Sequence, residues 1–158
     1  MFVSLALLLA LVALIGAIFW HNSAPERAML RVARLLKIPA ELLIPDPPAR
    51  WLSLQRCAEN RYTQLIYRLL PVAYRHRDLK GDEADDILAE LVELTGESCS
   101  RYACRQLGDM CFFLEEYTRS EEDAVLCDEL EKEFSQLHRA KRILESIQPR
   151  LVAYTQAT

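Results

Sequence analysis

The chain opens with a long uninterrupted apolar run. Residues 2–20 carry no charge, and their only polar side chain is Ser4. At a rise of about 1.5 Å per residue, a helix of this length just covers a hydrocarbon core of roughly 30 Å. No Lys or Arg precedes the run, and bulky Phe19 and Trp20 occupy the place where a cleavage site needs small residues. The pattern therefore predicts an uncleaved, single transmembrane helix over residues 1–21.

A basic amphipathic segment extends from Pro25 to Lys37, and Ser23 stands close enough to serve as its N-cap. One side of its helical wheel is apolar and comprises Met29, Val32, Ala33, Leu35 and Leu36. The other side is basic, and we expect it to contact lipid headgroups through Arg27, Arg31, Arg34 and Lys37. The wheel leaves two alternatives open for the apolar side, because it lies either in the headgroup plane or against the protein's own bundle.

Prolines interrupt the pattern between residues 38 and 50. Four of them forbid a continuous helix and stiffen the chain, although residues 40–43 can form one isolated turn. We interpret residues 22–50 as a basic amphipathic helix and a Pro-rich linker, which acts as a semi-rigid spacer between the membrane-proximal part and a distal domain.

Apolar residues recur at steps of three and four from residue 51 onward, which is typical of helices. They predict four helices over residues 51–70, 82–95, 97–117 and 120–148, with Pro71 kinking or ending the first and Pro149 ending the last. In the third helix the repeating set is Ala103, Cys104, Leu107, Met110, Cys111 and Leu114. Short loops favour antiparallel neighbours. The predicted fold class is therefore all-α: a transmembrane helix, a juxtamembrane helix, a Pro-rich spacer and a roughly four-helix antiparallel bundle over residues 51–158.

Charge is strongly segregated along the chain. The net charge is +6 over residues 21–80, −13 over 81–134 and +3 over 135–158. The positive flank after the apolar run predicts an N-terminus outside and a cytoplasmic C-terminal domain. The acidic start of the second bundle helix is either a solvated face or a docking face for a basic partner, formed by Asp82, Glu83, Asp85, Asp86 and Glu90.

Basic residues form a regular line along the first bundle helix. They are Arg56, Arg61, Arg68 and Arg75, and we expect them to pair with the acidic second helix. The distal domain has no basic patch interleaved with aromatic residues, which disfavours nucleic-acid binding.

The sequence contains no recognised catalytic constellation. Its five cysteines form no Cys-x-x-Cys, and none of its three histidines belongs to an HExxH or ExxH pattern. A phosphate-binding loop, a dinucleotide fingerprint and a nucleophilic triad are also missing. We therefore predict no enzyme activity, no catalytic residue, no cofactor, no metal site and no small-molecule substrate, and we expect most cysteines to pack in the core.

Small residues form a narrow stripe on the apolar helix. They are Ala6, Ala10, Ala13 and Ala17, and their spacing of four, three and four keeps them on one face. Such stripes allow close helix packing in membranes, although Ala is also common there by chance. These features predict a non-enzymatic, membrane-anchored interaction protein, an accessory or scaffold subunit whose partners are the bilayer and a membrane protein or a second copy. The alternative function is a membrane-tethered thiol-based redox sensor or enzyme that uses a helix-borne cysteine.

Overall fold

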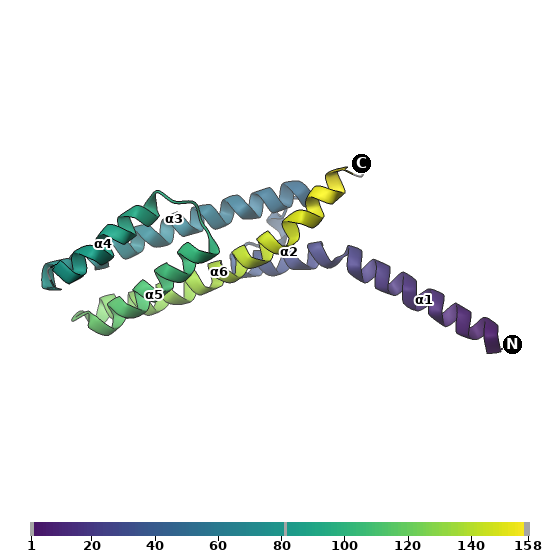
Figure 1. Ribbon diagram of the computed structural model, residues 1–158, viewed down its shortest axis with the longest axis horizontal. Helices are drawn as coiled ribbons and strands as arrows, with labels where there is room; N and C mark the ends of the chain where they lie inside the picture. The colour runs from purple at the N-terminus through teal and green to yellow at the C-terminus, as the bar shows by residue number, and fades with distance from the viewer. Residues whose placement is uncertain (1, 81, 157–158) are drawn as a thin grey trace.

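The computed structural model is all-helical, as predicted. It describes residues 2–80 and 82–156, with side chains described except at 2–5, 22, 78–80, 82–84 and 153–156. Within this described part the chain forms six α-helices and one 3-10 turn, and no strand. Figure 1 shows an elongated bundle from which the first helix projects.

Helix α1 (Phe2–Asn22) extends away from the bundle and meets α2 (Ala24–Leu35) at its C-terminal end (Figure 1). Only Ser23 separates the two helices, and Pro25 lies in the first turn of α2, where an N–H has no acceptor within the helix in any case. The predicted N-cap is wrong in its chemistry: the Ser23 hydroxyl does not accept a capping bond but donates to the Trp20 carbonyl, 3.2 Å away.

Helix α2 packs on the protein itself. Met29, Val32 and Ala33 are buried between α2, α3 and α6. Of the two alternatives left by the helical wheel, the structure shows packing on the bundle. After α2 the chain turns through the 3-10 turn η1 (Ala40–Leu42), and the side chains of Ile38 and Leu43 pack against the core. The Pro-rich segment thus joins two helices of one core and does not hold a distal domain away from α2.

Helix α3 (Pro47–Lys80) is longer than predicted at both ends, since it begins at Pro47, inside the predicted linker, and continues through Pro71. A proline is tolerated in the first turn, where its missing N–H has no helical acceptor in any case. Leu69 before this proline, and Val72 and Ala73 after it, are buried on one face, while Pro71 itself is exposed. Packing on both sides offsets the local cost of a proline, about 3 kcal/mol in a helix interior. Helix α6 (Glu121–Gln156) likewise runs through Pro149, with Ile147 and Leu151 buried around it.

The two shorter bundle helices are α4 and α5. Helix α4 (Asp82–Thr95) has the predicted bounds. Helix α5 (Arg101–Tyr117) starts a few residues later than predicted, because the Ser100 hydroxyl accepts a hydrogen bond from the Ala103 N–H at 3.0 Å and caps the helix there. At the start of α6, the Ser120 hydroxyl accepts a hydrogen bond from the Asp123 N–H at 3.3 Å and caps the helix.

Two long helices, α3 and α6, pack together as the frame of the bundle (Figure 1). Helix α4 folds back on α3, α5 folds back on the first half of α6, and α2 covers the second half of α6. The predicted repeating set of the third bundle helix is fully buried, as are Leu130, Phe134 and Leu137 of α6. The end of the bundle that adjoins α1 therefore consists of α2, α3 and α6.

Candidate functional site

Every described side chain of α1 is exposed up to His21. Leu7 is 66% exposed, Phe19 75% and Trp20 68%. The small-residue stripe lies on this helix, and all four of its members are exposed: Ala6, Ala10, Ala13 and Ala17. No single helix in the described part of the chain is long and apolar enough to cross a membrane, whereas Ala6–His21 and Ala24–Leu35, bent by 41°, meet those requirements together.

A compact set of contacts closes the junction between α1 and α2. The Arg27 guanidinium lies over the Trp20 ring, 3.8 Å from its centre, and donates to the Trp20 carbonyl at 2.7 Å. It also donates to the Ser23 hydroxyl. A cation at the C-terminal end of α1 satisfies carbonyls that the helix leaves unpaired and complements its dipole. Of the four basic residues predicted to contact headgroups, Arg27 therefore also fixes the junction.

The other three lie in a groove between α2 and α6. Its volume is about 800 Å³, and it is lined by Arg31, Arg34, Leu35, Lys37, Gln136, Arg139, Arg142, Ile143 and Ser146. Five of these residues are basic and none is acidic. The basic residues that line the groove from α2 were predicted from the sequence, but Arg139 and Arg142 were not. Only folding brings α6 beside α2. The run His138-Arg139-Ala140-Lys141-Arg142 was the available signal.

Lys37 ends α2 in a left-handed conformation with a φ of 58°. The Ile38 N–H bonds the Ala33 carbonyl at 2.8 Å and the Lys37 N–H bonds that of Arg34 at 3.1 Å, which is the hydrogen-bond pattern of a Schellman cap. The Lys37 ammonium pairs with Glu133, which also receives Arg61 at 2.7 Å. Desolvation raises the pKa of Glu133, but hydrogen bonds from Lys37 and Arg61 outweigh it and hold the pKa below its ordinary value.

Three of the four arginines in the basic line on α3 pair with α6, so the prediction that their partner is the acidic second helix is wrong, and Arg56 is exposed with no described ion pair. The ion pairs follow the antiparallel arrangement of α3 and α6: Arg61 pairs with Glu133, Arg68 with Glu129 at 3.4 Å, and Arg75 with Asp123. The last pair is bidentate, with Arg75 Nε 2.9 Å from an Asp123 oxygen, and this hydrogen bonding raises the pKa of Arg75. The cause of the difference is topological, since α6 lies along α3 for most of its length.

The predicted acidic docking face is described only in part. The side chains of Asp82 and Glu83 lie outside the described residues. Asp85 and Asp86 are exposed, and Asp85 pairs with Arg77 at 3.1 Å. Glu90 is half-buried and accepts a hydrogen bond from Gln106 of α5. Glu90 therefore joins α4 to α5. Among the predicted docking residues whose side chains are described, Asp86 is exposed and has no described ion pair.

Four of the five cysteines are buried, and Cys57 is half-buried. The sulfur atoms of Cys99 and Cys104 lie 3.7 Å apart, too far for a disulfide and close enough for a weak S–H hydrogen bond. The hydrogen bond with Cys104, followed by burial, raises the pKa of Cys99. Burial raises the pKa of Cys111 as well, and raises that of Cys127 to about 11. These shifts disfavour the thiolate, which is the reactive form.

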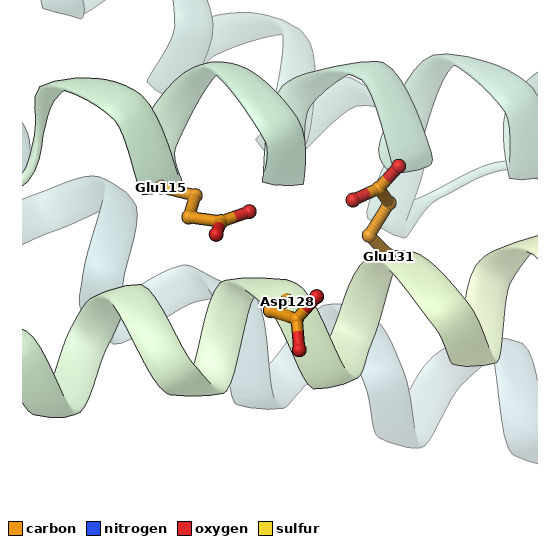
Figure 2. Close-up of side chains that lie close together, drawn as sticks. All are labelled: Glu115, Asp128 and Glu131. Carbon is orange, nitrogen blue, oxygen red and sulfur yellow. The ribbon is translucent and has the colours of Figure 1, made fainter.

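Three carboxylates converge between α5 and α6, an arrangement that sequence reasoning missed. Figure 2 shows Glu115 of α5 facing Asp128 and Glu131 of α6, and their oxygens lie within 4.8 Å of one another. Hard cations such as calcium favour oxygen ligands but take six to eight of them. The Lys132 ammonium donates to Asp128 at 2.6 Å, which raises the pKa of Lys132 and offsets part of the local negative charge. We therefore interpret the three carboxylates as a partly exposed acidic cluster whose charge Lys132 partly neutralises.

The strongest candidate features adjoin one another: the exposed apolar helix α1, the Trp20–Arg27 junction and the basic groove between α2 and α6. They share α2, whose first turn holds Arg27 and whose end holds Lys37. No family model, no curated protein and no solved structure matches this chain.

Proposed function

We propose that this chain is a non-enzymatic, membrane-anchored interaction protein, with α1 in the bilayer and the helical bundle in the cytoplasm. The observation that supports this most is the exposure of every described side chain of α1 up to His21. A continuous apolar surface of this kind is unfavourable in water, whereas a helix satisfies its own backbone and is stable in lipid. Trp20 suits the interfacial zone, and Arg27 beside it suits the anionic headgroup layer.

The second part of the proposal is that α1 also pairs with another membrane helix, so that the chain serves as an accessory or scaffold subunit. The support is the alanine stripe, whose four members are exposed and would allow a close approach. The partner is a membrane protein or a second copy. The exposed acids of α4, Asp85 and Asp86, remain candidates for docking a basic partner.

The test separates anchoring from pairing. We expect Ala10→Leu together with Ala13→Leu to reduce the size of the assembly extracted in mild detergent, measured by native electrophoresis, while the protein stays in membranes after an alkaline carbonate wash. The matched control is Leu8→Phe with Ile15→Phe, which adds bulk on the opposite face of α1. An assembly of unchanged size would contradict pairing, and release of the wild-type chain by carbonate would contradict anchoring. Protection of the bundle from protease in sealed, right-side-out vesicles is the outcome expected for a cytoplasmic bundle.

A thiol-based function is the competing proposal, and the 3.7 Å approach of Cys99 to Cys104 is the observation in its favour. Burial and the raised pKa of Cys99 speak against it, because thiolates react and buried thiols do not. We expect iodoacetamide to modify Cys57 of the native protein first and the buried cysteines slowly, measured by peptide mass spectrometry. Rapid modification of Cys99 or Cys104 in the folded protein would favour the thiol function instead.

A further inference from the structure

The groove between α2 and α6 gathers positive charge without compensating acids. Arg31 and Arg34 line it from α2, and Arg139 and Arg142 line it from α6. All four side chains are exposed, and none makes an ion pair among the described residues. The fifth basic residue, Lys37, pairs with Glu133.

The four groove arginines differ from the arginines that lie between two helices, which are paired. The arginines of α3 that face α6 have carboxylate partners, and so does Arg101 of α5, which binds Glu145 at 2.6 Å. Glu145 is the only acid between residues 135 and 158, and its contact with Arg101 directs it toward α5. Four convergent arginines therefore raise the local positive potential, which an anion bound in the groove would neutralise.

The groove fits a phosphorylated ligand in size and chemistry. Its volume of about 800 Å³ lies within the range of small-molecule sites, which are roughly 300–1,000 Å³. Guanidinium groups bind phosphate through two parallel hydrogen bonds, and arginine is favoured over lysine for that reason. Gln136 and Ser146 add neutral polar groups to the lining. We propose that this groove binds a ligand with two or more phosphate groups.

Two sources share this chemistry: the headgroup of a phosphorylated lipid and a soluble phosphate ester. Arg31 is nine residues beyond the end of α1, or about 13 Å along a helix, so the near end of the groove is within reach of a headgroup that projects from the bilayer. The far end at Lys37 is accessible from solution. The site is built by α2 and α6 alone, so it goes beyond the proposed anchoring and does not require α1 to lie in a membrane.

The first experiment measures binding with no bilayer present. The full chain in a neutral maltoside detergent is titrated with sodium tripolyphosphate by calorimetry. We expect saturable binding that weakens about tenfold or more in Arg139→Gln with Arg142→Gln, because hydrogen bonds to charged groups contribute that much each. The control is Arg56→Gln with Arg119→Gln, which removes the same charge from exposed positions outside the groove. Since the two helices contribute equally, Arg31→Gln with Arg34→Gln should reproduce the loss, and helical circular dichroism verifies the fold of each variant.

The second experiment identifies the source. Arginine modification by phenylglyoxal is mapped by mass spectrometry on the full chain in phosphatidylcholine nanodiscs, in the same discs with tripolyphosphate, and in discs containing phosphatidylinositol 4,5-bisphosphate. Protection of the four groove arginines but not of Arg56, by either probe, supports the proposal and assigns the soluble or the lipid source. Absence of protection by both probes would overturn it, as would tripolyphosphate binding that falls equally in the control variant. Failure of the chain to enter nanodiscs would count against anchoring only, because the detergent titration is independent of it.

Discussion

At the scale of single residues, Glu133 joins three helices. It lies on α6, receives Lys37 from the end of α2 and receives Arg61 from α3. Its side chain is 17% exposed, whereas that of Lys37 is 59% exposed, so water screens part of the interaction. The sequence showed the charges but could not show this pairing, because Lys37 and Glu133 are 96 residues apart.

This carboxylate gives the fold a specific dependence on pH. The pKa of Glu133 is lower in the folded state than its ordinary value of 4.5. A group of this kind contributes stability above its unfolded pKa and loses that contribution as the pH falls through its folded pKa. We expect Glu133→Gln to lower stability by about 1 kcal/mol at pH 7, which lowers the melting temperature by about 3 °C, and to have a smaller effect at pH 3, below the ordinary pKa of the carboxyl group.

The measurement is thermal unfolding by circular dichroism in neutral detergent at both pH values. Glu129→Gln is the control, since Glu129 faces Arg68 at 3.4 Å and is 58% exposed, and its effect should be smaller. A difference between wild type and Glu133→Gln that persists undiminished at pH 3 would contradict this account of the site.

At the scale of helices, apolar periodicity predicted where helices occur and prolines misled the prediction of where they end. The periodic set of α5 is buried as the pattern indicated. The first and last bundle helices nevertheless run through Pro71 and Pro149. Local sequence shows the missing N–H of a proline but not the long-range packing that offsets it. The position of α2 could not be predicted for the same reason, since a helical wheel shows an apolar face but not whether lipid or protein covers it.

Pro71 should therefore cost stability without serving the fold. It is exposed on α3 between buried turns, and its ring removes one helical hydrogen bond. We expect Pro71→Ala to stabilise the bundle by about 1–3 kcal/mol and to raise its melting temperature. Pro25→Ala in the first turn of α2 should change little, because no hydrogen bond is lost there. A lower melting temperature for Pro71→Ala would show that the helix depends on the shape the proline imposes.

At the scale of the whole molecule, the chain separates into a bundle and a projecting helix. The buried core begins at Met29, and no described side chain of α1 belongs to it. The charge pattern of the sequence predicted the basic region near the anchor, yet half of the groove's arginines come from residues more than a hundred positions further along. Folding brings the arginines of α2 and α6 together, and the sequence of α2 by itself does not indicate that α6 will lie beside it.

The separation predicts that the bundle folds without α1. A chain of residues 23–158 should be soluble and helical, with a melting temperature within about 3 °C of the full chain. The described contacts that are lost join Phe19 and Trp20 to Ser23 and Arg27 at the junction, and they lie outside the core. Circular dichroism and gel filtration test this directly. An unfolded or aggregated product would mean that α1 contributes to the core of the bundle.

The single residue between α1 and α2 has a geometric consequence. Ser23 alone separates the helices, and Arg27 donates hydrogen bonds to both Ser23 and Trp20. An anchored α1 would therefore fix the rotational orientation of the bundle about the membrane normal. Each residue inserted into a helix rotates the remainder of the chain by about 100° and advances it by about 1.5 Å. The side of the bundle that neighbours in the bilayer meet would therefore be set by the length of this junction to within one residue.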